Sequence, residues 1–382
     1  MIEKRWNPWR HFDYVLLVAA LLLTMYGIAM VYSATLADSP RSAPFLSTFP
    51  GHQAIFAAMG LLLLIVFTLV DSRWIRAASY PIYGVNLVLL VAVAAIGARS
   101  HGAQRWIDVG FFRFQPSELA KLLIILTLAK FFADHRDKIH EFRYVLMSLA
   151  IVGVPVVLVY VQPDLGTALV LIAIWIGMAV MAGVRLAHLG LLGGAVALMA
   201  PLVWQFMKDY QRARLLIFLN PESDPSGEGY NMIQSRISVG SGGWTGQGFA
   251  HGTQSQLDFL KVQHTDFIFA VLGEELGFIG AMALFALFII LLFRIIRSAA
   301  EQKDVFGRTF AAGVASMLLF QIFINVGMTI GLMPVTGIPL PFISYGSSNL
   351  LTTLLAFGLL QSLLTGAHKS AWDGWTGGQL AA

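Results

Sequence analysis

The chain has 382 residues, of which 57% are hydrophobic and only 12% charged, and its mean hydropathy is +0.72. Soluble domains carry about 25% charged residues, so this composition excludes a soluble globular protein and indicates a polytopic membrane protein. The absence of cysteine excludes disulfides, thiolate metal sites and cysteine catalysis. The net charge of +4 does not indicate nucleic-acid binding, because no basic face with interleaved aromatic residues occurs outside the apolar stretches.

Ten apolar stretches are long enough to cross a bilayer, which takes about 20 residues. They predict an all-α fold of ten transmembrane helices in a single membrane domain over residues 1–382. The first stretch is too long for the core of a signal peptide, so we expect a retained anchor. In chain order the stretches are Tyr14–Leu36, Gln53–Val70, Ala77–Ala98, Ser117–Phe132, Tyr144–Val161, Leu165–Val184, Leu186–Met207, Phe267–Phe293, Thr309–Leu332 and Asn349–Leu364.

The basic residues predict the orientation of these helices. If the N-terminus is inside, 15 of the 25 Lys and Arg residues fall in inner segments and nine in outer segments, five of these nine in one long loop. Short cytoplasmic loops are enriched in Lys and Arg, whereas long loops follow this rule poorly. We therefore expect a multi-pass protein of the cytoplasmic membrane with both termini in the cytoplasm.

The outer segment before the fourth stretch contains Arg105 and Trp106, in the run AQRWIDVG. An arginine offers a planar fork that suits phosphate, and a tryptophan ring suits the membrane interface. Each residue has an ordinary alternative, because arginines also solvate loops and tryptophans also form interfacial belts. The pair is a candidate substrate contact.

Within the fourth stretch, Glu118 and Lys121 are three residues apart and therefore share one face of a helix. A single charge is costly inside a membrane, but a paired charge can remain ionised within the bundle. The pair is interpreted first as a structural ion pair holding two helices, and second as a substrate contact through Lys121.

Asp164 follows Pro163, in VQPDLGTA, at the start of the sixth stretch. It can cap that helix with its side chain. It also lies toward the same outer half of the bundle as Glu118 and Lys121, and buried polar groups that face a bundle interior mark pathways or catalytic sites. Both interpretations stay open.

A loop of 59 residues, Met207–Thr265, separates the seventh and eighth stretches. Loops of this length are usually functional, although a covering lid without chemistry is the alternative. The loop supplies two further candidate phosphate donors, Arg212 and Arg214. Between Asn231 and Phe249, apolar residues recur at helix-like spacing and predict an amphipathic segment on the outer surface; they are Met232, Ile233, Ile237 and Val239.

Asp266 marks the boundary between this polar loop and the eighth stretch. If a helix starts there, the residues 7, 11 and 14 positions later lie within about 40° of it. These residues are Gly273, Gly277 and Gly280, which would allow another helix to approach closely. An acid at the outer edge of such a face is a candidate catalytic group, and a simple N-cap is the alternative.

A second irregular outer segment, Gly331–Ser348, has three prolines and three glycines in 18 residues. This composition excludes a helix. Apolar, non-helical backbone at membrane depth survives only where it is buried in protein or lines a cavity, so the segment is a candidate cavity wall.

Five ordered motifs of the chain resemble the SEDS family (shape, elongation, division and sporulation proteins), and they cover nearly its whole length. They are AQRWIDVGFFRFQPSELAK, QPDLGTA, FLNPESDPSGEGYNMIQS, HTDFIFAVLGEELG and MPVTGIPLPFISYG. The last motif, together with SQLDFL, is more similar to the elongation members than to the division members. Two departures occur: Leu260-Lys261-Val262-Gln263 stands where the family often has Leu-Pro-Glu, and Ser347 replaces a family glycine.

The resemblance implies an inner-membrane peptidoglycan glycosyltransferase that polymerises lipid II into glycan strands during elongation. It also implies a class B penicillin-binding protein as partner. By the same resemblance, Asp266 is the essential acid, Arg105 and Trp106 are tied to activity, and Asp164 is a cavity carboxylate. Glu118 and Lys121 match the family's intramembrane ion pair.

Lipid II polymerisation needs a base for the incoming sugar hydroxyl and cations for the departing pyrophosphate. We expect Asp266 to be the base, and Arg105, Lys121, Arg212 or Arg214 to neutralise phosphate. No acidic cluster fixes a metal, so a divalent cation such as Mg or Mn stays open. Three alternatives remain: a lipid II flippase, a division-type polymerase, and a scaffold that only recruits the penicillin-binding protein.

Overall fold

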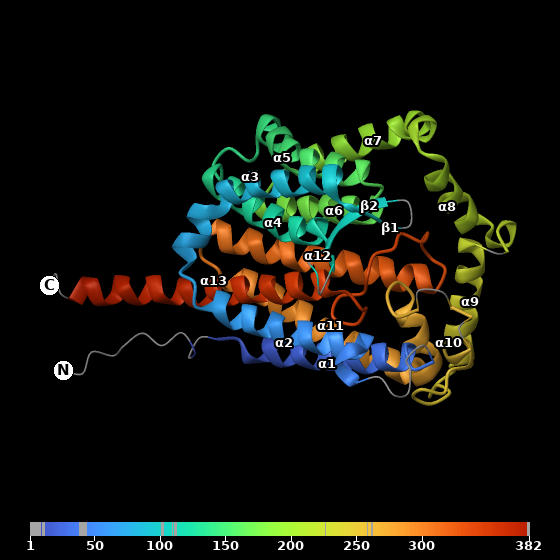
Figure 1. Cartoon of the computed structure of the whole chain (residues 1–382). Helices are drawn as coiled ribbons and strands as arrows, with labels where there is room; N and C mark the ends of the chain where they lie inside the picture. Colours follow the sequence, from blue (N-terminus) through green and yellow to red (C-terminus); the bar gives the residue numbers. More distant parts are fainter. Residues whose placement is uncertain are drawn as a thin grey trace.

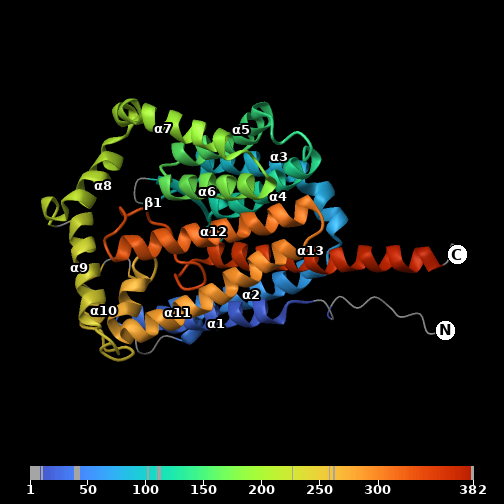
Figure 2. The same ribbon diagram turned by 180° about the vertical axis from the view of Figure 1, so that it is seen from behind.

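The computed structural model is a bundle of long helices with a cap of short helices at one end (Figure 1). It describes residues 9, 12–37, 44–100, 103–108, 110, 113–225, 227–257, 259–260 and 263–379. Lys261 and Val262, which belong to the first departure from the family motif, lie outside these residues. The start of α1 and the end of α13 lie at the same end of the bundle, opposite the cap (Figures 1 and 2).

The described residues form thirteen α-helices and one small sheet. The helices are α1 (Tyr14–Ala34), α2 (Phe49–Thr68), α3 (Ser72–Ile96), α4 (Pro116–Asp134), α5 (Phe142–Val161), α6 (Leu165–Ala182), α7 (Leu186–Phe206), α8 (Asp209–Leu219), α9 (Glu228–Ser241), α10 (Thr253–Gln256), α11 (Ile268–Glu301), α12 (Val305–Thr329) and α13 (Ser347–Gln379). Two 3₁₀ turns, η2 (Phe45–Ser47) and η3 (Pro221–Ser223), complete them.

Every predicted apolar stretch coincides with a helix. Among the described residues, eight helices are long and apolar enough to cross a membrane: α1, α2, α3, α5, α6, α11, α12 and α13. The other two predicted spans correspond to α4, whose hydropathy is lowered by four charged residues, and to α7, which contributes a shorter apolar stretch. The chain is therefore a polytopic, largely helical membrane protein, as predicted.

The sheet was not predicted. Three short antiparallel strands, β1 (Ala98–Ser100), β2 (Ala103–Asp108) and β3 (Arg113–Phe114), lie between α3 and α4 in the order β1-β2-β3. The segment carries no long alternating pattern, because six residues is its longest strand. The sheet fixes the chain just before α4, so it determines where Arg105 and Trp106 lie.

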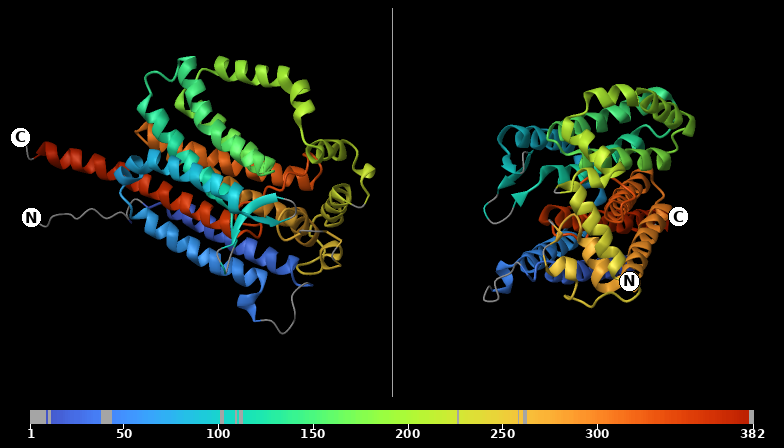
Figure 3. Two further views of the ribbon diagram at one scale, coloured as in Figure 1. Left: turned by 45° about the horizontal axis from the view of Figure 1, so that its top comes forward. Right: turned by 90° about the vertical axis from the view of Figure 1, so that its right-hand side faces the viewer.

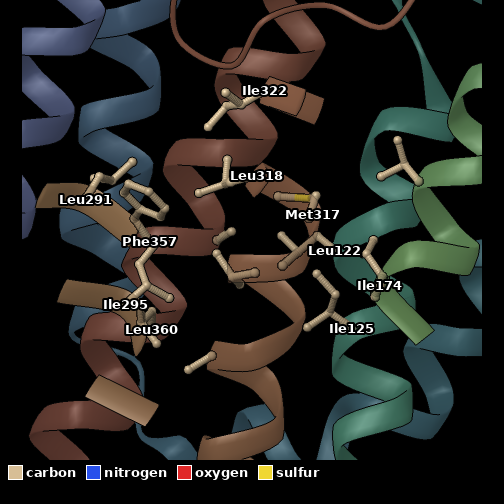
Figure 4. Close-up of a cluster of buried hydrophobic side chains, with 14 of the residues drawn as sticks. Leu122, Ile125, Ile174, Leu291, Ile295, Met317, Leu318, Ile322, Phe357 and Leu360 are labelled. Carbon is tan, nitrogen blue, oxygen red and sulfur yellow. The ribbon is translucent and has the colours of Figure 1, made fainter. Parts of the chain in front are cut away.

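The hydrophobic core is centred on α12, which packs against α4, α6 and α11. Figure 4 shows α12 between α4 and α6 on one side and α11 and α13 on the other. The buried side chains that meet there include Leu122, Ile125, Ile174, Leu291, Ile295, Met317, Leu318, Ile322, Phe357 and Leu360. Because α12 packs against helices on both sides, its C-terminal end is held in place beside the irregular segment that follows it.

The long segment between α7 and α11 is not a bare loop. It folds into α8, η3, α9 and α10, which cross the end of the bundle (Figure 3). The apolar spacing around Met232 correctly indicated a helix, which is α9. Met232 is buried there, whereas Ile237 is exposed on the other side.

Helix α11 is interrupted at Gly277, whose backbone angles (φ 63°, ψ −159°) are not helical and are accessible almost only to glycine. The backbone groups released by the break are satisfied by the segment that follows α9. The carbonyls of Glu274 and Glu275 accept from Gln247 N and Gly248 N at 2.9 and 3.0 Å. Phe278 N and Ile279 N donate to the carbonyls of residues 243 and 244 at 2.9 and 3.1 Å.

Two buried carboxylates reinforce this junction. Glu274 accepts hydrogen bonds from Gln254 N (2.7 Å) and Ser255 N (3.2 Å) at the start of α10. Glu275 accepts from Ala250 N (3.1 Å) and from the hydroxyl of Ser33 in α1. Both side chains are fully buried. The outer part of α11, the end of α1 and residues 243–256 are thus joined into one unit.

Candidate active site

Asp266 lies in a turn just before α11, and the N-cap residue of α11 is Phe267. The N-cap interpretation of Asp266 is therefore wrong. The predicted glycine face is also wrong as a continuous strip, because the helix begins later and breaks at Gly277. Close approach does occur at Gly273, but the neighbour is α9: a Cβ on Gly273 would lie 3.2 Å from Val239.

The side chain of Asp266 is partly buried and faces the irregular segment between α12 and α13. A Cβ on Gly337 would lie 3.5 Å from its Oδ2, and Gly337 has a left-handed φ of +71° that favours glycine. The segment is irregular throughout, as its prolines and glycines predicted. It therefore forms a wall beside the Asp266 carboxylate.

Loss of hydration raises the pKa of Asp266 from 3.8 to about 6. Smaller influences act in the other direction: a hydrogen bond from the Thr265 side chain and the positive charges of Arg214 and Arg105. The negative charge of Asp164 raises the pKa further. Two arginines and a second carboxylate are thus close enough to Asp266 to influence its ionisation.

Asp164 caps α6 and also connects it to its neighbours. Its Oδ1 accepts from Thr167 N at 3.2 Å, which is the capping bond. Its Oδ2 accepts from Ser117 Oγ at 3.2 Å and Gln115 Nε2 at 3.3 Å, both at the start of α4. The capping interpretation of Asp164 is therefore confirmed, and the same carboxylate also joins α6 to α4. Its role in the site stays a prediction.

Arg105 lies on β2, and its Nη1 is 4.0 Å from Asp164 Oδ1. Its Nε donates to the carbonyl of Gln162 at 3.1 Å, which fixes the guanidinium beside the start of α6. About a third of the side chain is exposed (31%), so the fork stays accessible. Trp106 is the next residue on the strand, and successive side chains of a strand point to opposite faces, so its ring lies on the other face of β2.

Glu118 and Lys121 form the predicted ion pair, with Nζ to Oε2 at 2.6 Å. Both side chains are buried, with exposures of 5% and 2%. Because both belong to α4, the second helix is reached through Asn349 of α13, whose Nδ2 donates to Glu118 Oε2 at 2.8 Å. Lys121 is thus bound to Glu118, and both residues lie within about one helical turn of Ser117.

The two arginines of the long loop both lie on α8, but their side chains have different neighbours. Arg212 donates to the carbonyls of Trp204 and Gln205 at 3.0 and 2.7 Å, so it binds the end of α7. Arg214 instead lies where its charge acts on Asp266. The structure therefore brings together Asp266, Asp164, Arg105 and Arg214, and it leaves Arg212 outside this group.

Tyr210 on α8 was missed in the sequence. Burial raises the pKa of its phenol, while the charges of Arg105 and Arg214 oppose that rise. It therefore lies near both arginines. The run YQRARLLIFL held a signal, because Tyr210 is four residues from Arg214 and so shares its face of a helix.

Among the described residues, no three His, Asp or Glu side chains are grouped so as to hold a metal ion. The two carboxylates of the site are instead accompanied by arginines. The arrangement is a carboxylate of raised pKa with two guanidinium groups beside it, which can accept a proton and neutralise an anionic leaving group.

Comparisons with known proteins show the family to which this chain belongs. A family model described as a cell cycle protein, FtsW, RodA and SpoVE, matches residues 13–369. The peptidoglycan glycosyltransferase MrdB of Escherichia coli K12 is 40% identical over 357 residues, 93% of this chain and 94% of that protein. The stage V sporulation protein E of Bacillus subtilis is 39% identical over 368 residues, 94% of this chain and 98% of that protein.

Solved structures are similar as well. A chain from a peptidoglycan synthase complex, in a structure described as coordinating polymerization and crosslinking, has a TM-score of 0.80 and 32% identity, covering 94% of this chain and 99% of that one. The rod shape determining protein RodA of Thermus thermophilus has a TM-score of 0.70 and 30% identity, covering 95% and 99%. The chain therefore belongs to the FtsW, RodA and SpoVE family of cell cycle proteins, the SEDS family that its motifs resemble.

Proposed function

We propose that this chain is a peptidoglycan glycosyltransferase that polymerises lipid II into glycan strands during cell elongation. Its relatives include proteins named peptidoglycan glycosyltransferase at 38–40% identity over almost the full length. The observation that carries the proposal is the grouping of Asp266 with Arg105 and Arg214 at one end of the bundle. A transferase of this kind needs one base and a cationic place for pyrophosphate.

In the proposed reaction, Asp266 accepts the proton of the sugar 4-hydroxyl as that oxygen attacks the anomeric carbon of the second lipid II. The bond from that carbon to the lipid pyrophosphate breaks, and the pyrophosphate leaves with the electron pair. Arg105 and Arg214 stabilise the charge that develops on it. Asp164 holds Arg105 in place, and the ring of Trp106 contacts substrate or lipid at the interface.

We assign Glu118 and Lys121 a supporting role in this scheme, because the ammonium group is buried and already bound to a carboxylate. The same reasoning assigns Arg212 to the α7–α8 junction.

We further propose ten membrane crossings in one domain, with α4 and α7 added to the eight apolar helices. Both termini would then be cytoplasmic, in a bacterial inner membrane. Support comes from the polarity of the helices: α4, α6 and α11 all start at the end that carries α8–α10, together with Asp164 and Asp266. The opposite end carries Arg76, bound to Asp304, and Arg294, bound to Asp13.

Lipid II must reach the site with its tail in the membrane. Helix α7 offers a route, because apolar side chains are exposed along it, with Leu186 at 71%, Leu198 at 85% and Phe206 at 77%. A helix so little covered by its neighbours faces lipid on several sides. We propose that the lipid tails enter beside α7, between the spans.

A class B penicillin-binding protein is the proposed partner. Support comes from the similar chain in the peptidoglycan synthase complex, whose description joins polymerization to crosslinking. Stimulation by an elongation-type partner, but not by a division-type partner, would separate the elongation role from the division role.

The deciding experiment is polymerisation by the purified full chain with lipid II in detergent, where no flipping is needed. We expect glycan strands on a gel, more with the partner present, and none with Asp266→Asn. Absence of polymer under all conditions, together with lipid II movement across vesicles, would overturn the proposal in favour of a flippase.

A further inference from the structure

Three consecutive carbonyls, those of residues 264–266, are held by side chains and backbone from distant segments. The carbonyl of His264 accepts from Tyr345 N at 2.9 Å. The carbonyl of Thr265 accepts from Ser344 Oγ at 2.6 Å. The carbonyl of Asp266 accepts from Asn325 Nδ2 at 3.0 Å. None of these bonds touches the carboxylate, but together they fix the backbone that carries it.

The bond from Asn325 occupies the Asp266 carbonyl, which an earlier start of α11 would use. In a helix that began earlier, Ala270 N would donate to the Asp266 carbonyl, four residues back. Ala270 N instead donates to Phe267 at 2.9 Å, and the Asp266 carbonyl is free for Asn325. Loss of that bond would allow α11 to lengthen by a residue and turn the Asp266 side chain to a different direction.

The same amide also holds the wall beside the carboxylate. Asn325 Nδ2 donates its second hydrogen to the carbonyl of Ile338 at 2.8 Å. Ile338 directly follows Gly337, which lies against Asp266 Oδ2. One buried amide group therefore binds both the backbone of Asp266 and the wall beside its carboxylate.

The position of Asn325 is fixed by its surroundings. It lies near the end of α12, the central helix of the core, and its side chain is fully buried. Both amide hydrogens are used by carbonyl oxygens, which also settles the orientation of the amide, because an oxygen in that position would face two other oxygens.

We propose that Asn325 is a positioning residue for Asp266, which fixes the direction of the carboxylate and its distance from the Gly337 segment. The proposal rests on the proposed role of Asp266 as the base. Asn325 does not contact substrate; it acts by keeping the base in the geometry that proton transfer requires.

The test compares Asn325→Leu with Gln321→Leu in the full chain. Gln321 lies one turn earlier on α12, is equally buried, and its amide has no hydrogen-bond partner among the described residues. Asn325→Ala is the second variant, because the smaller side chain leaves room for water to satisfy the two carbonyls without holding them.

We expect both Asn325 variants to lower kcat by about tenfold or more, with KM changed less than about twofold. The acid limb of the pH–rate profile of both variants should move to lower pH by about half a unit. The reason is that Asp266 gains water, which favours its ionised form, beside Arg105, Arg214, Asp164 and His264. Gln321→Leu should match the wild type. A purely structural defect would lower the rate equally at every pH, and that result would overturn the proposal.

Hydrogen–deuterium exchange of the peptide covering residues 263–270 gives a second measurement that needs no substrate. We expect about tenfold faster exchange in the Asn325 variants than in Gln321→Leu. Equal exchange in all variants would refute the inference, even if the wild type polymerises lipid II. If the wild type does not polymerise, the proposed function fails and exchange alone decides whether Asn325 holds Asp266.

Discussion

The carboxyl group of Asp266 has a pKa of about 6 because it is largely removed from water, and this determines the expected pH dependence. A base must be ionised to accept a proton. We therefore expect kcat/KM for lipid II to fall tenfold per pH unit below about pH 6 and to level off above about pH 7. Polymerisation rates measured at a series of pH values check this. A midpoint near the ordinary value of 3.8 would contradict the burial of the base.

Replacing Asp266, the proposed base, separates the effect on activity from the effect on stability. Asp266→Asn should lower polymerisation by about 10²–10⁴-fold. It should also stabilise the fold at pH 7.5, by something on the order of 2 kcal/mol, because the raised folded-state pKa means that ionisation favours the unfolded chain. The gain should disappear below about pH 4, where the wild-type carboxyl is protonated in both states. Thermal unfolding in detergent measures it, and activity within about threefold of wild type would remove Asp266 from the base role.

The buried Glu118–Lys121 pair in α4 predicts that a double variant is more stable than a single variant. Glu118→Ala leaves Lys121 without its carboxylate, which costs roughly 3–5 kcal/mol. The double variant Glu118→Ala/Lys121→Met removes both charges and should be more stable than Glu118→Ala alone. Unfolding temperatures and polymerisation of all three proteins check this order. A double variant that is stable but inactive would show instead that Lys121 contacts substrate.

At the level of elements, the break in α11 depends on a single residue. Gly277→Ala places a side chain in a conformation that is nearly exclusive to glycine and pushes it into the backbone of Thr245 and Gly246. We expect a loss of about 2–4 kcal/mol, with release of residues 243–256 from α11. Limited proteolysis of that segment checks the release. The matched control is Gly153→Ala on α5, where a Cβ meets nothing within 4 Å and should be neutral or stabilising.

The helices could be predicted from the sequence, but the connections between them could not. Apolar stretches end where turn residues and charges begin, so α1 to α7 were found with only small errors at their ends. The break at Gly277 was missed because it depends on Gln247 and Gly248, about 30 residues earlier, which complete the hydrogen bonds of the broken helix. No local pattern encodes a contact of that kind.

Within the candidate site, too, some residues could be predicted from local sequence and others could not. Asp266, Asp164 and Arg105 could be found because charged residues at the edges of apolar stretches are rare and costly. Arg212 and Arg214 could not be told apart, since their directions depend on where α7 ends. Asn325 could not be identified from the sequence. Gln321 is a similar amide residue in the same apolar stretch, yet its side chain makes no hydrogen bond among the described residues.

For the whole molecule, the cap formed by α8–α10 predicts a coupling to the proposed partner, a class B penicillin-binding protein. It exceeds what is needed to join α7 to α11, and Ile237 and Trp244 are exposed on it, at 46% and 74%. We expect Ile237→Ser and Trp244→Ala to weaken stimulation by a class B penicillin-binding protein by about threefold or more, with smaller effects on the basal rate. Polymerisation with and without the partner measures both. Variants that respond normally, or a partner-free chain already at the full rate, would refute the coupling.

The junction between the cap and α11 also has a consequence for how the protein is made. After Gly277, α11 has 24 residues up to Glu301, about 36 Å of helix, which is enough for the hydrocarbon layer. The outer segment that precedes it exposes backbone groups that lipid cannot satisfy. Residues 243–248, which do satisfy them, are synthesised before α11. In the proposed topology they must cross the membrane before α11 is inserted. We therefore expect a chain with a truncated cap to be degraded during insertion rather than to accumulate as an inactive enzyme, which pulse labelling of the chain in cells would show.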